Sequence, residues 1–433
     1  MAPNLQRFPS SPITSSFNSH DDDRIKCALL GTGMMGQEHI SYIMGFSNQI
    51  RIDYLCDPFQ PSLDKARKIM NDFAIADPVM ADKNRDHQPI VFTDEEELFE
   101  HVDDIDLLII ASPNYTHTPI LMRWGRNDIT ILVEKPVAVS QQQHDDLVRA
   151  SSSPDWKARI WVAMEYRYIP AIAKLLELVP LIGETKMMTI RENRYPFLHK
   201  IGKWNRDVEK TGDTLVEKCC HFFDLFRLIS SKGNGDKVRE AQLPKVRALA
   251  QRGINYGDED DMYERPIIDS AYVTMPFKDA NPSKEGGQWM NTIGCLELCM
   301  FSEGSRHQEE IIVTGTAGRV EAYLPENKVY FFERPNHDLW NDRSVPPPPE
   351  SIKQQVFDCS DVRAIHSIEG DIPTHSGYHY CSTAVEWCYL LSTIQKHKAT
   401  GEWTPHVSLN DGLRAVELGI VATSELVNEL DDE

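Results

Sequence analysis

The first part of the chain alternates between short apolar runs and longer segments with helical periodicity. The runs that read as buried strands lie at 26–30, 52–56, 106–111, 130–133 and 159–164, and helical segments cover 34–45, 62–73, 116–126 and 140–152. Strands that alternate with helices build βαβ units around a parallel sheet. The pattern therefore predicts a doubly wound parallel sheet over residues 23–168, interrupted by a polar, irregular insertion loop at 76–90.

The pattern changes after residue 170. A helical segment at 169–179 and a strand at 185–193 precede a helix over 213–230, and six alternating runs then follow between 246 and 333. Short alternating runs separated by turns are typical of antiparallel pairing. Residues 334–372, which contain the sequence PPPPE, read as an irregular excursion, and helices over 376–396 and 409–429 close the chain.

These two sequence patterns predict the fold class α/β, with two domains. A Rossmann-type, doubly wound parallel sheet occupies 23–168, and an α+β domain with a large, open, mostly antiparallel sheet occupies 169–433. A length of 433 residues agrees with two domains, because single cores stop growing beyond about 250–300 residues. Residues 1–22 are rich in Ser, Pro and Asn and predict a disordered extension.

The net charge and the cysteine content limit the kinds of binding partner and the cellular location that we expect. The net charge of −21 argues against a nucleic-acid or membrane-surface binder, because both of those partners are anionic. No apolar run is long enough to cross a bilayer. The nine cysteines are scattered and form no Cys-x-x-Cys pair, which favours a reducing, cytoplasmic location. The acid-poor start of the chain leaves an organelle-targeting segment open as an alternative.

The strongest motif follows the first predicted strand and opens the first predicted helix. It reads Gly31-Thr32-Gly33-Met34-Met35-Gly36. Glycines at this spacing allow a tight turn, a close approach of a diphosphate, and close packing of helix against strand. The helix N-terminus adds free N–H groups and partial positive charge for the anion. This motif predicts a dinucleotide site even in an acidic chain.

Asp57 ends the second strand, 21 positions after Gly36. A carboxylate at that place accepts hydrogen bonds from the adenosine ribose hydroxyls and repels a 2′-phosphate. The alternative is a turn-forming Asp-Pro, which is common in proteins. Together with the glycines, Asp57 favours NAD over NADP.

Two further loops follow strands at the edge where ligands bind in such sheets. The first is Ser112-Pro113-Asn114-Tyr115-Thr116-His117, which also fits an ordinary strand–helix turn. The second is Glu134-Lys135-Pro136. A lysine there is often only a solvated charge, but an ammonium beside a carbinol oxygen stabilises a developing alkoxide. Lys135 is therefore a candidate catalytic residue.

The stretch 215–228, LVEKCCHFFDLFRL, concentrates polar side chains between apolar ones. On a helix Glu217, His221 and Asp224 share one stripe. An imidazole suits proton transfer at neutral pH, and Asp224 either orients His221 or anchors the helix. The plainer alternative is a core helix with solvated polar groups. Cys219, Cys220 and His221 diverge by about 100° each on a helix, which excludes a tetrahedral zinc site built from these three residues.

The glycine motif, the Glu-Lys-Pro after the strand that follows Ser-Pro-Asn-x-x-His, and the later acid-x-x-x-His-x-x-Asp together resemble the glucose–fructose oxidoreductase/inositol dehydrogenase/rhizopine-catabolism (Gfo/Idh/MocA) family. The resemblance covers about residues 24–429. It implies an NAD(P)-binding Rossmann domain and a substrate domain whose open sheet often builds dimers or tetramers. It also implies oxidation of sugars, cyclitols or related secondary alcohols.

The resemblance also carries roles to individual residues. It implies Lys135 and His221 as catalytic residues, with the acidic position, usually aspartate in the family, taken here by Glu217. It places Lys135, Arg167, Glu217 and His221 against the substrate. The implied cofactor contacts are Gly31, Thr32, Gly33, Met34, Met35, Gly36, Asp57, Ser112, Pro113, Asn114, His117, Glu134, Lys135, Trp204 and Arg206.

These observations lead to a functional hypothesis with two rivals. The chain is expected to be an NAD-dependent dehydrogenase that acts on a secondary hydroxyl of a polyol or sugar, and to form a homodimer or homotetramer. One rival is a redox-neutral epimerase or eliminase that retains its NAD. The other is a non-catalytic NAD-binding regulator of the same fold, against which the presence of both Lys135 and His221 argues.

Overall fold

The computed structural model describes residues 23–76, 88–233, 240–255, 266–277, 292–335, 344–347, 351–368 and 379–430. The predicted N-terminal extension lies outside the described residues. So do most of the predicted insertion loop and parts of the predicted excursion at 334–372.

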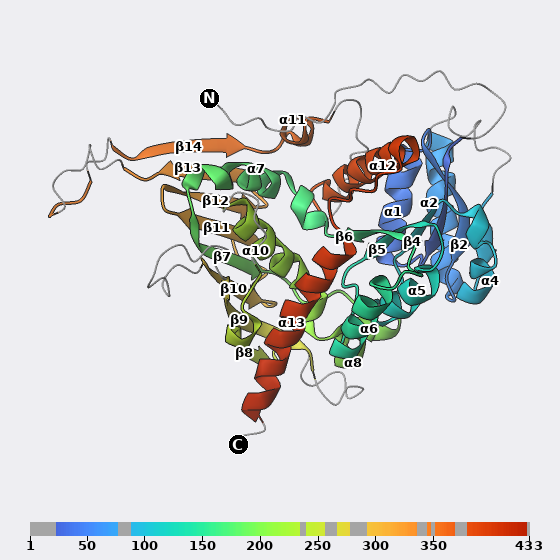
Figure 1. Cartoon of the computed structure of the whole chain (residues 1–433), viewed down its shortest axis with the longest axis horizontal. Coiled ribbons are helices and arrows are strands. Elements are labelled where there is room, and N and C mark those ends of the chain that lie inside the picture. Colours follow the sequence, from blue (N-terminus) through green and yellow to red (C-terminus); the bar gives the residue numbers. More distant parts are fainter. Residues whose placement is uncertain are drawn as a thin grey trace.

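The first sheet has six strands in the order β3-β2-β1-β4-β5-β6, and every pair is parallel. Helices flank it, so the predicted doubly wound sheet is confirmed (Figure 1). Strand order reverses between β1 and β4, and ligands bind at the carboxyl ends of strands at such a point. The strands are β1 Ile25–Leu30, β2 Ile50–Cys56, β3 Ile90–Phe92, β4 Leu107–Ile110, β5 Thr130–Glu134 and β6 Arg159–Ala163, and the helices are α1 Met34–Gly45, α2 Gln60–Ala76, α4 Glu95–Phe99, α5 His117–Trp124 and α6 Gln141–Ser151.

The second sheet has eight strands in the order β14-β13-β12-β11-β7-β10-β9-β8. Within the described strands of this sheet only β7 and β10 pair in parallel, which confirms the prediction of a mostly antiparallel sheet. The strands are β7 Thr185–Asn193, β8 Arg247–Arg252, β9 Ile268–Phe277, β10 Thr292–Cys299, β11 Glu309–Gly315, β12 Gly318–Leu324, β13 Lys328–Glu333 and β14 Lys353–Asp358.

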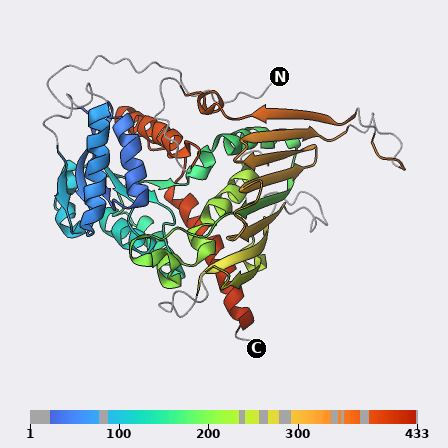
Figure 2. The same cartoon turned by 180° about the vertical axis from the view of Figure 1, so that it is seen from behind.

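Three helices cover one face of this sheet: α7 (Pro170–Leu178), α10 (Cys220–Lys232) and α13 (Leu409–Leu430) (Figure 2). Side chains alternate along the strands, as in β12, where buried and partly buried residues follow each other in turn. One face is therefore apolar core, and the opposite face is open.

Two predictions about local structure are wrong. The region 334–372 is not irregular throughout, because it contains the edge strand β14 and the short helix α11 (Val362–His366). The single helix expected over 213–230 is broken: α9 (Thr214–Glu217) ends before α10 begins at Cys220. The break occurs at Lys218 and Cys219, so Glu217 and His221 do not lie on one continuous helix.

Helix α12 (Ser382–Thr400) crosses back to the first sheet and packs beside α1 (Figure 1). Its Trp387, Leu390 and Leu391 join the same core as Ile25 and Leu29 of β1. The segment that follows the predicted boundary at residue 169 thus supplies core to the first sheet.

None of the helices in the described ranges is long and apolar enough to span a bilayer.

Candidate functional site

The glycine-rich turn joins β1 to α1, and each of its glycines meets a different steric demand. Gly31 has a φ of +93°, and a Cβ there would lie 2.5 Å from the backbone of Ala111 and Ser112. A Cβ on Gly36 would lie 2.1 Å from the Gly31 carbonyl oxygen, whereas one on Gly33 would meet nothing within 4 Å. The turn is therefore closed around Gly31 and Gly36 and open at Gly33, which fits a diphosphate at the N-terminus of α1.

Asp57 lies beside this turn. Its Oδ2 accepts hydrogen bonds from the Thr32 backbone N–H at 2.7 Å and from Thr32 Oγ1 at 3.1 Å, and its Oδ1 accepts one from the Phe59 N–H at 2.9 Å. The carboxylate thus fixes the glycine-rich turn to the end of β2. A ribose contact by Asp57 stays a prediction.

The two loops after β4 and β5 are joined by His117. Its Nδ1 lies 2.8 Å from the Pro136 carbonyl oxygen, and its Nε2 lies 2.9 Å from the Ser112 carbonyl oxygen. Burial lowers the pKa of His117. Both ring nitrogens face backbone carbonyls, so His117 holds the two loops together, and its expected contact with the cofactor stays a prediction. Asn114, in contrast, has a buried Nδ2 without a hydrogen-bond partner among the described residues, and this donor is free for a ligand.

The Glu134 carboxylate is held in place by a buried histidine and a tryptophan. Its Oε1 lies 2.9 Å from His39 Nε2 of α1, and His39 Nδ1 accepts a hydrogen bond from Trp387 Nε1 of α12 at 3.1 Å. His39 therefore donates from Nε2 to the carboxylate. This Trp387–His39–Glu134 series links α12, α1 and β5 directly behind Lys135.

Lys135 and Glu217 meet across the two domains. Lys135 Nζ donates to the Glu217 carbonyl oxygen at 3.2 Å and lies 3.8 Å from Glu217 Oε2. Lys200 Nζ lies 3.5 Å from the other carboxylate oxygen. Burial alone would raise the pKa of Glu217, but Lys135 and then Lys200 hold it at about 2. Glu217 is therefore a buried carboxylate between two ammonium groups.

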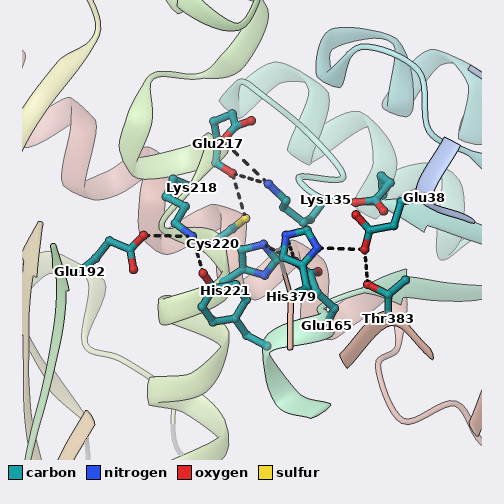
Figure 3. A network of polar contacts seen from close by, with 12 residues as sticks. Glu38, Lys135, Glu165, Glu192, Glu217, Lys218, Cys220, His221, His379 and Thr383 are labelled. Carbon is teal, nitrogen blue, oxygen red and sulfur yellow. Dashed lines mark hydrogen bonds and ion pairs between the residues drawn. The ribbon is translucent and has the colours of Figure 1, made fainter. Parts of the chain in front are cut away.

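His221, in α10, is buried and carries one free nitrogen. Its Nε2 lies 3.3 Å from Glu165 Oε1, and its ring stacks on Tyr166 with centroids 4.6 Å apart. Its Nδ1 has no hydrogen-bond partner among the described residues. Burial lowers the pKa of His221 well below its usual value, and the positive charges of Lys135 and Lys218 lower it further. The lowered pKa favours the neutral imidazole, whose Nδ1 is a proton acceptor. Figure 3 shows His221 among these polar groups.

Asp224 does not orient His221. It accepts two hydrogen bonds from Arg167, at 2.6 and 2.5 Å, and Arg167 also donates to the His406 carbonyl oxygen at 2.6 Å. Asp224 therefore takes the alternative role of anchoring α10, here to η3 (Glu165–Tyr168). The guanidinium of Arg167 is engaged on all three nitrogens, and its expected contact with substrate stays a prediction without geometric support.

The expected contacts of Trp204 and Arg206 also stay predictions. Both lie in η5 (Ile201–Arg206), where the Trp204 ring is 4.5 Å from Lys200 Nζ and Arg206 Nη2 is 3.3 Å from His199 Nε2. The segment thus borders the Glu217 side of the site through Lys200.

A second polar cluster lies behind His221 on the inner face of the large sheet. Glu192 and Glu309 stand opposite each other on β7 and β11. Lys218 Nζ lies 3.2 Å from Glu192 and donates to the Tyr166 hydroxyl at 2.6 Å, which in turn donates to Glu309 at 3.0 Å. Burial, with the charge of Glu192, raises the pKa of Glu309 to about 8. This cluster fixes the Tyr166 ring against which His221 stacks.

Several of these groups were missed from sequence. Glu165 follows β6 and so obeys the same carboxyl-end rule that singled out Lys135, which makes it the one that could have been found. Glu38 and His379 also lie beside the site: His379 Nδ1 lies 3.0 Å from Glu38 Oε1, and its Nε2 lies 3.9 Å from Glu165 Oε1. No local sequence pattern indicates these two residues. Among the described residues, no group of three His, Cys, Asp or Glu side chains is arranged to hold a metal ion.

Comparison with known families finds matches to both domains of the chain. The family model described as "Oxidoreductase family, NAD-binding Rossmann fold" (Gfo/Idh/MocA) matches residues 25–157, and the model of that family's C-terminal alpha/beta domain matches residues 181–425.

Two curated relatives are similar over parts of their length. A 2,7-anhydro-N-acetylneuraminate hydratase of Mediterraneibacter gnavus is 25% identical over 252 residues, which are 58% of this chain and 58% of the relative. An inositol 2-dehydrogenase of Rhizobium meliloti is 23% identical over 207 residues, 47% of this chain and 54% of that relative. The matches thus span little more than half of these proteins.

Among solved structures, levoglucosan dehydrogenase in complex with NADH and levoglucosan superposes with a TM-score of 0.66 at 16% identity. The superposition covers 94% of this chain and 98% of the other. At this level of identity the likeness concerns the fold.

Proposed function

Because the chain belongs to the Gfo/Idh/MocA oxidoreductase family, we propose that it is an NAD-dependent dehydrogenase that oxidises a secondary hydroxyl of a cyclitol or sugar. The observation that carries this proposal is His221: a buried, neutral imidazole with a free Nδ1, in the same polar network as the ammonium of Lys135 (Figure 3). A proton acceptor and a fixed cation are the two groups that alcohol oxidation needs around the carbinol oxygen.

Each residue of the site has one role in the proposed reaction. His221 Nδ1 accepts the hydroxyl proton, and Lys135 stabilises the negative charge that develops on the oxygen. Glu217, ionised because its pKa is held at about 2, accepts a hydrogen bond from a neighbouring hydroxyl of the polyol. Bound NAD supplies the acceptor for the hydride that leaves the carbinol carbon. The glycine-rich turn, Asp57 and the Asn114 amide are the groups that would hold the dinucleotide.

The redox-neutral rival has one observation in its favour. A relative that is 25% identical is named a hydratase, and hydration or elimination leaves no net reduced cofactor. Both reactions begin with the same proton abstraction at His221, so the residue set alone is compatible with either. Release of the reduced cofactor separates them.

The test is a panel of cyclitols, aldoses and sugar acids incubated with excess NAD, with NADH followed by its absorbance. The dehydrogenase proposal expects stoichiometric NADH with at least one compound, and none with a His221→Asn variant that still binds NAD. Tight NAD binding with consumption of a panel compound but no NADH would favour the retained-cofactor reaction. Binding without any conversion would favour the regulatory protein.

Asp57→Ala is expected to weaken NAD binding by about 10-fold or more while NADP binding is unchanged or stronger. The reason is that hydrogen bonds to a carboxylate contribute about 1.5–3 kcal/mol, and the same charge repels a 2′-phosphate. Dissociation constants of both cofactors, measured by calorimetry, check this. Equal weakening of both would mean that Asp57 acts only by holding the turn at Thr32.

We also propose assembly through the open face of the large sheet. Met187 and Ile293 are neighbours on β7 and β10 and are 58% and 52% exposed, and Leu249 and Tyr272 form a second exposed pair on β8 and β9. Exposed apolar side chains at neighbouring positions favour an interface. Light scattering is expected to give the mass of a dimer or tetramer, and a monomeric mass that persists at high protein concentration would contradict this.

A further inference from the structure

Four side chains, beginning with His221, follow one another in space from the core toward the surface. His221 Nε2 lies 3.3 Å from Glu165 Oε1, the same Glu165 oxygen lies 3.9 Å from His379 Nε2, and His379 Nδ1 lies 3.0 Å from Glu38 Oε1. The residues come from α10, η3, the turn that precedes α12, and α1, and Figure 3 shows them side by side. Thr383 Oγ1 donates to Glu38 at 2.8 Å and fixes the outer end.

Exposure rises along this series. The His221 and Glu165 side chains are 2% and 4% exposed, and those of His379 and Glu38 are 24% and 17% exposed. The inner end therefore lies in the core, and the outer end reaches solvent. Oε2 of Glu165 has no hydrogen-bond partner among the described residues, so Oε1 alone contacts both histidines.

The affinity for protons also changes along the series. Burial and the charges of Lys135, Lys218, His379 and Arg194 lower the pKa of His221. Burial also lowers the pKa of His379, but Glu38 and Glu165 outweigh it and raise the pKa above its usual value, against a smaller effect of Lys218. Burial raises the pKa of Glu165, which makes it able to hold a proton briefly. His221 therefore binds a proton weakly and His379 binds one strongly, so proton transfer from His221 to His379 is favourable.

The proposed oxidation creates a need for such a path. For each alcohol oxidised to a ketone, two electrons and one proton leave as hydride, and the hydroxyl proton goes to His221. Because His221 is buried, that second proton has to leave before the next turnover. An imidazole that gains a proton at Nδ1 releases the one at Nε2, and Nε2 faces Glu165.

We propose that Glu165, His379 and Glu38 form a proton relay that returns His221 to its neutral state by passing the substrate proton to solvent. This inference rests on the proposed dehydrogenase function. The Nε2 proton of His221 passes to Glu165, the carboxyl proton passes to His379 Nε2, and the Nδ1 proton of His379 passes to Glu38 and from there to solvent. Each ring then carries its remaining proton on the other nitrogen, and proton exchange through water restores the starting tautomer before the next turnover. The 3.9 Å step exceeds a hydrogen bond, so it is completed by a water molecule or by a small shift of the His379 ring.

The first test reads protonation directly and needs no substrate. The histidines are labelled with nitrogen-15, the His379 signal is assigned by its loss in His379→Asn, and its pKa is measured in the holoprotein with NAD. Glu165→Gln and Glu38→Gln are each expected to lower the pKa of His379, because each removes a facing carboxylate. An unchanged pKa in both variants would overturn the relay. His366→Asn is the control, since His366 bonds to the Tyr168 carbonyl oxygen outside the series.

The second test reads turnover with the best compound of the panel. Glu165→Gln and His379→Asn are expected to lower kcat by about 10²-fold, the lower end of what proton transfer contributes, with little change in KM. Imidazole or formate buffer is expected to restore much of the rate in His379→Asn, as small acids and bases replace a missing carrier. A merely structural role predicts no rescue and a change in KM, and that outcome would overturn the relay.

The two tests separate the possible failures. If the wild-type protein converts no compound, the proposed function fails, while the His379 titration still tests the coupling within the series. If wild-type turnover is normal and the Glu165 and His379 variants match it, the relay alone fails.

Discussion

Replacing Lys135 by methionine is expected to lower kcat/KM by about 10²- to 10³-fold, the range measured when one donor to a developing oxyanion is removed. Methionine keeps the apolar stem that packs at the end of β5 and removes only the charge. The dissociation constant for NAD is expected to stay within a few-fold of the wild-type value, because the glycine-rich turn and Asp57 are unaltered. Steady-state kinetics and calorimetric NAD binding on the same preparation measure both quantities.

Lys200→Met is the matched control. Lys200 forms the other ion pair with Glu217, at 3.5 Å, but it does not follow a strand of the first sheet. If Lys135 acts on the substrate oxygen, its loss is expected to reduce turnover far more than the loss of Lys200. Equal losses would mean that both lysines act only by holding Glu217, and near-normal turnover of Lys135→Met would remove Lys135 from the reaction.

Arg167→Met is expected to lower the free energy of unfolding by about 3–5 kcal/mol, the range found when one partner of a buried ion pair is removed. The variant leaves Asp224 buried without its two guanidinium hydrogen bonds, and it releases the His406 carbonyl oxygen as well. Urea unfolding at pH 7, followed by tryptophan fluorescence, measures the change.

Two further variants make this prediction decisive. Arg159→Met removes an ion pair to Asp128, whose side chain is 78% exposed, and it is expected to cost less than about 1 kcal/mol. The double variant Arg167→Met with Asp224→Leu is expected to recover part of the loss, because no unpaired charge remains. If Arg167→Met is as stable as the wild type and instead raises KM, then Arg167 contacts the substrate after all.

Much of the fold followed from periodicity alone. The strands of the first sheet are almost uniformly apolar because both of their faces are covered, and those of the second alternate because one face is open. The glycine-rich turn could also be predicted from the sequence, because any residue with a Cβ would clash with the backbone at Gly31 and Gly36. Lys135 was found by its place after a strand, which needs no contact information.

The rest could not be found this way for physical reasons. Strand β14 is exposed along nearly its whole length, so it carries no alternation. The break at Lys218 and Cys219 occurs inside a segment without Gly or Pro, so no residue type marks it. The groups that Lys218 contacts there, Tyr166 and Glu192, are distant in the sequence. Glu38 and His379 are 341 positions apart, and no local pattern links them.

The return of α12 to the first sheet sets the order in which the molecule is completed during synthesis. Residues 23–168 leave the ribosome first and contain all six strands of that sheet. Yet Trp387, Leu390 and Leu391, which fill the core beside Ile25 and Leu29, are made more than two hundred residues later. The cofactor domain therefore waits, with part of its apolar surface uncovered, until almost the whole chain has emerged. The first domain to be translated is thus completed only after most of the second has been made.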